Sequence, residues 1–133
     1  MNTNDHESLF GEVIYSYTRA QALADGFQVE VSKVAVEAGI RLPVFLTRAT
    51  YDAYVTVPPG VTCQDESGRL CDIMTMLRLA ICKAQPGQTR LSFALYVRND
   101  NHARRLVKLI ALCGGLDIDD PQPAITVLLP DED

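Results

Sequence analysis

Hydrophobic and polar residues alternate along the chain with two different periods, one helical and one extended. Between Arg69 and Ala84, apolar residues recur at steps of three and four, which predicts an amphipathic helix with one face on the core. Leu91, Phe93, Leu95 and Val97 alternate with Ser92, Ala94, Tyr96 and Arg98. This spacing predicts a strand with one buried face.

Two more strands are predicted in the last third of the chain. Asn99–His102 has the composition of a turn, so Leu106–Cys113 is expected to return as a strand that Gly114 and Gly115 end. Asp117–Gln122 is predicted to be an acidic loop, and Pro123–Leu129 to be the final strand.

Three short helices are predicted in the first half of the chain. Thr18 and Gln21 have the spacing of a capping box, in which each side chain bonds the other's backbone. Ser32 is expected to cap a second helix, and Thr47 a third that runs through Tyr54. Such short helices depend on packing against the rest of the protein.

Together these elements predict an α+β fold: short N-terminal helices and one long amphipathic helix packed on a mostly antiparallel sheet of 3–5 strands. Phe27–Val31 alternates like a short strand, and Pro43 suits a first helical turn or an edge strand. We expect a single domain over residues 1–133, with flexible ends at 1–9 and 130–133.

Composition narrows the possible functions and the expected compartment. The 133 residues include 47% hydrophobic residues and carry a net charge of −5, so direct nucleic-acid binding by a basic face is not expected. Protein partners, small ligands and mimicry of a nucleic acid stay open. Because Met1–Ser8 lacks the pattern of an export signal and no apolar run is long enough to span a bilayer, we expect a cytoplasmic protein.

Neither a metal nor a cofactor is expected. The four cysteines form no C-x-x-C pair, and only His6 and His102 could assist them. In a protein without an export signal, reduced and buried thiols are the expected state. No G-x-S-x-G sequence is present, and no Ser or Cys has a nearby His. These patterns predict no catalytic residues, although an exposed and reactive Cys63 stays open.

Charge is strongly segregated near the C-terminus. Residues 88–108 hold five basic residues and one acid, whereas residues 109–133 hold six acids and no base. One interpretation is a binding surface for acidic groups beside an acidic docking tail. The other is that neighbouring strands offset each other's charges. The candidate binding residues in the basic segment are Arg98, Arg104, Arg105 and Lys108.

Two further segments are candidates for binding. Tyr17, Arg19 and Gln21 lie at a helix start, where backbone donors favour an anion. Alternatively, the tyrosine packs on the protein and Arg19 lies in solvent. Asp65 and Glu66 precede the long helix, where paired carboxylates serve acid–base chemistry or simply cap the helix.

Three stretches, in this order and spacing, resemble an uncharacterised family of short bacterial proteins carried on plasmids, phages and integrative elements. They are Tyr17–Gly26 (YTRAQALADG), Gln64–Asp72 (QDESGRLCD) and Ala124–Asp133 (AITVLLPDED). The resemblance supplies no activity or ligand. It implies a small accessory product of mobile DNA, and such products often act on a host protein.

The sequence therefore favours a non-enzymatic binding protein with a host or element-encoded protein as its partner, in some cases inhibiting a host defence system. A homodimer is also considered. One alternative is a small enzyme or a nucleotide- or anion-binding domain that uses the Tyr17–Gln21 helix start. A second alternative is an acidic mimic of DNA.

Overall fold

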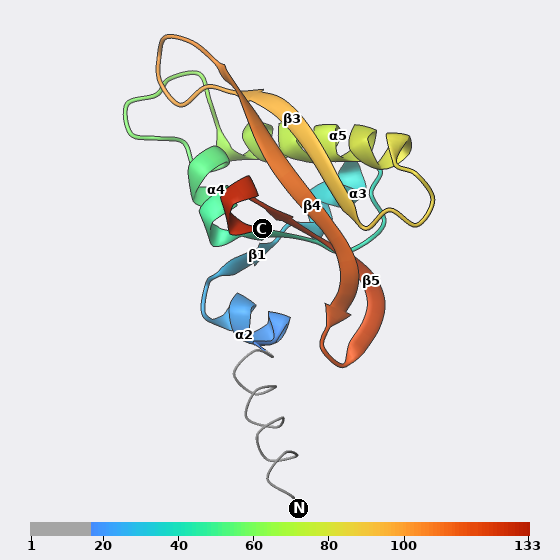
Figure 1. The fold of residues 1–133 in the computed structure, drawn as a ribbon. Coiled ribbons are helices and arrows are strands. Elements are labelled where there is room, and N and C mark those ends of the chain that lie inside the picture. Colours follow the sequence, from blue (N-terminus) through green and yellow to red (C-terminus); the bar gives the residue numbers. More distant parts are fainter. Residues whose placement is uncertain (1–16) are drawn as a thin grey trace, which may run out of the picture.

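The computed structural model describes residues 17–133, which form one five-stranded sheet with helices around it (Figure 1). The strand order is β1-β2-β5-β4-β3. The β2–β5 pair is parallel and the other three pairs are antiparallel. The strands are β1 (Gln28–Glu30), β2 (Val44–Thr47), β3 (Arg90–Val97), β4 (Arg105–Asp117) and β5 (Asp120–Leu128). The expected flexible segment 1–9 lies outside the described residues.

Four α-helices of the described residues accompany the sheet, and the long one packs on it, which confirms the predicted α+β fold. They are α2 (Arg19–Ala24), α3 (Ser32–Glu37), α4 (Arg48–Tyr54) and α5 (Glu66–Lys83). Within residues 17–133, no helix combines the length and apolar character that crossing a membrane requires.

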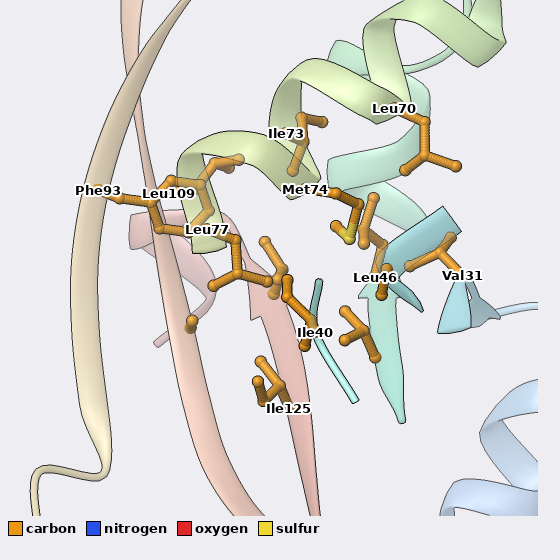
Figure 2. Close-up of a cluster of buried hydrophobic side chains, with 14 of the residues drawn as sticks. Val31, Ile40, Leu46, Leu70, Ile73, Met74, Leu77, Phe93, Leu109 and Ile125 are labelled. Atoms are coloured by element: carbon orange, nitrogen blue, oxygen red, sulfur yellow. The ribbon is translucent and has the colours of Figure 1, made fainter. Parts of the chain in front are cut away.

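The core lies between α5 and one face of the sheet (Figure 2). Ile73, Met74 and Leu77 of α5 have no exposed surface and point toward the sheet, with Met74 beside Leu46 of β2. Burying each such side chain stabilises the fold by about 1.5–3 kcal/mol. The alternation predicted for β3 is confirmed, because Leu91, Phe93, Leu95 and Val97 are all buried on this face.

The capping predictions for α2 and α4 are confirmed. Thr18 accepts a hydrogen bond from the backbone N–H of Gln21, and the Gln21 side chain accepts one from the N–H of Thr18. Thr47 caps α4 by accepting from the N–H of Thr50. Local sequence therefore sets the start of both helices.

The prediction that Ser32 caps α3 is wrong. The cap position is Val31, and Ser32 is the first helical residue. Its hydroxyl donates to Glu30 and accepts from the N–H of Val44, at 2.8 and 3.1 Å. The hydroxyl thus joins the helix to β2 instead of closing the helix end.

The predicted acidic loop at Asp117–Gln122 is wrong, because most of it belongs to a hairpin. Strand β4 continues past Gly114 and Gly115 to Asp117, with a bulge, and β5 already begins at Asp120. Glycine in a strand interior weakens the strand but does not prevent pairing. Gly114 and Gly115 therefore remain paired with β5.

The C-terminal residues, expected to be flexible, fold back on the sheet. Pro130–Glu132 forms a 3-10 turn. The Glu132 carboxylate accepts from the hydroxyl of Thr47 at 2.7 Å. Asp133 forms an ion pair with Arg90 at 2.5 Å.

Candidate binding surface

The hairpin tip between β3 and β4 is built by Asp100. Its carboxylate accepts from the backbone N–H groups of His102 and Ala103, at 2.8 and 3.1 Å. These bonds hold the pKa of Asp100 below its usual value. The tip places Arg104 and Arg105 in exposed positions at the start of β4. Together with Arg98 and Lys108, they form what we call the basic corner.

Beneath the basic corner lies Arg69 of α5, a charged side chain that is only 5% exposed. Its guanidinium donates to the carbonyl oxygens of Tyr54 and Arg98, at 2.9 and 2.8 Å, and to the side-chain oxygen of Asn99 at 2.5 Å. Burial, and secondarily the charge of Arg98, lower the pKa of Arg69. A guanidinium nevertheless stays protonated, so this is a buried positive charge held by neutral oxygens.

Arg98 and the neighbouring asparagines fix the loop between α4 and α5. Arg98 donates to the carbonyl oxygens of Thr62 and Asp100. Asn101 donates to the carbonyl of Gly60 at 2.8 Å and accepts from the N–H of Thr62 at 2.9 Å. The Arg98 side chain, predicted to bind a partner, is therefore occupied in holding this loop to the hairpin.

A pocket of about 440 Å³ opens beside these arginines. Its lining carries three guanidinium groups and a single carboxylate, so its charge favours anions. The polar and charged residues that line it include Tyr54, Gln64, Arg69, Asp72, Arg98, His102 and Arg104. Asp72 of α5 supplies that carboxylate.

Two large apolar side chains lie exposed next to the basic corner. Tyr96 on β3 and Leu106 on β4 are register partners and are 59% and 58% exposed. The guanidinium of Arg104 stacks over the Tyr96 ring, 5.2 Å from its centroid. Aromatic and arginine side chains that touch in this way are typical of the central residues of protein interfaces.

The acidic segment does not neutralise the basic corner. Within residues 17–133, the ion pairs are Arg48–Asp52 and Arg90–Asp133. Local charge offset between neighbouring strands, one of the two interpretations of the charge segregation, therefore occurs at Arg90. It does not extend to Arg98, Arg104, Arg105 or Lys108.

The helix start at α2 already holds an anion from the protein itself. The Asp117 carboxylate accepts from the backbone N–H groups of Arg19 and Ala20, at 2.9 and 3.1 Å. These bonds, and the nearby charge of Arg19, lower the pKa of Asp117. The position where an external anion was predicted is thus filled.

The side chain of Arg19 is half-buried and lines a pocket of about 380 Å³ together with Asp117. It donates to Leu116, Gln28 and Thr126, and its guanidinium lies 4.1 Å from the centroid of the Phe45 ring. Burial lowers the pKa of Arg19 while the Asp117 charge opposes that shift. Arg19 therefore joins α2 to the sheet.

The two other candidates at the α2 start are also engaged locally. The hydroxyl of Tyr17 donates to Asp25 at 2.5 Å, and this bond raises the Tyr17 pKa to about 12. Gln21 completes the capping box of α2 with Thr18. Neither side chain extends toward the start of α5.

Asp65 and Glu66 have local roles at the start of α5. Asp65 caps the helix by accepting from the N–H of Gly68 at 2.6 Å. Glu66 accepts from the Tyr51 hydroxyl at 2.7 Å, which raises the pKa of Tyr51. Asp65 lines a pocket with Cys63, Gly68 and Asp72, whereas Tyr17 and Arg19 line two other pockets. The helix-capping interpretation is the one observed.

The four thiols are free, but the expectation that they are buried is wrong. Cys63, Cys71 and Cys82 are exposed, and Cys113 is half-buried. Burial raises the pKa of Cys113. Cys63 has a positive φ of 61° in its loop. In the described part of the chain, no group of three or more His, Cys, Asp or Glu side chains is placed to hold a metal ion.

Sequence reasoning missed Arg69, the residue that organises this region. A signal was present, because Arg69 lies four residues before Ile73 and therefore on the apolar face of α5. A positive charge on that face predicts a buried and hydrogen-bonded guanidinium.

In comparisons with known proteins, no family model, curated protein or solved structure matches the chain.

Proposed function

We propose that this chain is a non-enzymatic binding protein that recognises an acidic protein surface through its basic corner and the adjacent Tyr96 and Leu106. The proposal rests on one observation: exposed Tyr96, stacked under Arg104, lies beside cations that form no ion pair within residues 17–133. Interfaces of this composition bind through a few aromatic and arginine side chains.

The proposed partner is a host or element-encoded bacterial protein. Motif resemblance supports an accessory role for a mobile element, and binding of a host protein fits that role. Inhibition of a host defence system is one form that such binding would take.

The alternative functions have less support. An enzyme or nucleotide-binding domain at the α2 start would need its anion position free, and Asp117 fills it. An acidic DNA mimic would need its carboxylates exposed in a row. Three of the C-terminal acids, Asp117, Glu132 and Asp133, make contacts within the protein instead.

Charge reversal at the basic corner tests the proposal. We expect immobilised wild-type protein to retain a defined partner from bacterial lysate and R104E/R105E to lose it, because two attractive contacts become repulsive. Both side chains are exposed, so the free energy of unfolding of the double variant is expected to differ from that of wild type by about 0.5 kcal/mol or less.

The control is K33E on α3, which reverses one charge, half the change in R104E/R105E, at an exposed position away from the corner. It should retain the partner. Equal retention by R104E/R105E and K33E, or no partner at all, would contradict the proposal.

A further inference from the structure

Within residues 17–133, strand β3 is a long free edge of the sheet, since its only partner strand there is β4 (Figure 1). The N–H of Cys113 donates to the carbonyl of Thr89 at 2.8 Å, and the register then continues without a shift. In an antiparallel pair, residues alternate between facing the partner and facing away. The backbone groups of Ser92, Ala94 and Tyr96 therefore face outward, and they receive no hydrogen bond from residues 17–133.

A groove accompanies this free edge. A pocket of about 260 Å³ lies between α5 and β3, and it shares Asp72, Leu95 and Tyr96 with the pocket at Arg69, so the two lie side by side and together form the groove. The residues that line the smaller pocket are Asp72, Thr75 and Met76 of α5, Ala94, Leu95 and Tyr96 of β3, and Leu106 of β4.

The groove is positively charged where β3 ends, because Arg98 and Arg104 line it there. Arg90 lies at the other end of the strand, and no acidic residue lies between Arg90 and Arg98. A second copy paired antiparallel on this edge and centred on Ala94 would place Arg98 of each copy opposite Arg90 of the other, and like charges on facing strands are destabilising. The occupant that fits is a different polypeptide with acidic residues near Arg98 and Arg104.

We propose that the free edge of β3 takes an extended segment of the partner as a sixth strand, with the segment's acidic residues at the Arg98–Arg104 end. This inference rests on the proposed function and names how the partner binds. Outward N–H and C=O groups of β3 supply the backbone hydrogen bonds, and the basic corner selects the acidic side chains. Because Asp72 lines the groove, the residue of the segment nearest to it is neutral or basic.

Hydrogen exchange monitored by NMR tests strand addition directly. The probe is an extended peptide that alternates Val and Thr and has two Glu residues at one end. We expect it to slow exchange at the amides of Ser92, Ala94 and Tyr96 by at least about tenfold at saturation, since these amides gain partners. The amides of Leu91, Phe93 and Leu95 already face β4 and should change little. The same peptide with Lys in place of Glu should bind at least about tenfold more weakly.

Two modifications that remove backbone hydrogen bonds distinguish strand addition from binding by charge alone. The first is the acidic peptide N-methylated at alternate residues, which leaves the protein unaltered and removes the peptide's donors. The second is A94P, because proline on an edge strand loses an outward N–H and leaves the ladder with β4 in place. Each modification is expected to weaken binding by about tenfold or more. The exchange pattern of β3 and β4 reports whether A94P is folded.

The outcomes distinguish this inference from the proposed function. If the acidic peptide binds and R104E/R105E abolishes binding, but N-methylation has no effect and the three amides stay unprotected, strand addition is overturned while the basic corner stands as a binding surface. If R104E/R105E also binds the peptide and the lysate partner as wild type does, both proposals fall.

Discussion

The guanidinium groups of Arg19, which is half-buried, and of Arg69, which is buried, lie in different electrostatic surroundings. Arg19 lies next to the Asp117 carboxylate, which binds the backbone of the same helix turn. Arg69 is held by carbonyl and amide oxygens, with Arg98 close enough to lower its pKa. At α2, the protein thus supplies its own anion, the Asp117 carboxylate. At the basic corner, the positive charge is not balanced by a carboxylate of the described residues and can attract an anionic group of a partner.

Replacing the buried guanidinium should have the largest effect on stability. In Arg69→Met, the carbonyls of Tyr54 and Arg98 lose their donor, and the loop between α4 and α5 loses an anchor. We expect the free energy of unfolding to fall by about 3 kcal/mol in urea titrations. The control is Arg105→Met, at an exposed position, with an expected change within about 0.5 kcal/mol. Equal stability of the two variants would remove the contrast between buried and surface arginines.

The anion at the α2 end should make stability depend on pH in a specific direction. Because the folded pKa of Asp117 is lowered from the usual 3.8, its contribution is complete above that value and is lost as the pH falls below it. Asp117→Asn should therefore unfold at a lower temperature than wild type near neutral pH, and the difference should shrink in acid. Thermal unfolding at about pH 7 and about pH 2 measures this. The control is Asp131→Asn, which removes a carboxylate that accepts no hydrogen bond from residues 17–133. Its unfolding temperature should differ little from that of wild type at either pH. A pH-independent difference for Asp117→Asn would show that its charge is unimportant.

The smallest expected effect concerns the ionisation of Tyr17 at the same end. The Tyr17 hydroxyl donates to Asp25, so its pKa is raised to about 12. Asp25→Asn should return this pKa toward 10, because the phenolate no longer faces a negative charge. Ultraviolet absorbance during alkaline titration, compared with Tyr17→Phe to isolate this tyrosine, gives the value. An unchanged titration would mean that the contact with Asp25 does not form.

Features set by neighbouring residues could be predicted from the sequence. The capping box at Thr18 and Gln21, the cap at Thr47 and the alternation of β3 each depend on residues a few positions apart. Such local patterns carry the geometry in themselves. The long helix was predicted from Arg69, whereas it begins at Glu66 after the Asp65 cap.

Features set by distant residues could not be predicted. Pairing of β2 with β5 joins residues about eighty positions apart, and nothing near Val44 encodes its neighbour. The anion at α2 likewise comes from Asp117, and the role of Ser32 depends on the N–H of Val44. For the candidate site, charge segregation indicated Arg104 and Arg105. It gave no sign that Arg98 would be occupied by the loop.

Strand β5 lies between β2 and β4, so it alone connects the two halves of the sheet. During synthesis, the β1–β2 pair, which α3 connects, and the β3–β4 hairpin are available as separate two-stranded units before β5 leaves the ribosome. Neither unit can bury its apolar face fully until then, and two-stranded ribbons are marginally stable in water. A nascent chain of this protein therefore exposes unpaired strands until β5 has been synthesised, and exposed strands of this kind are prone to aggregate during that interval.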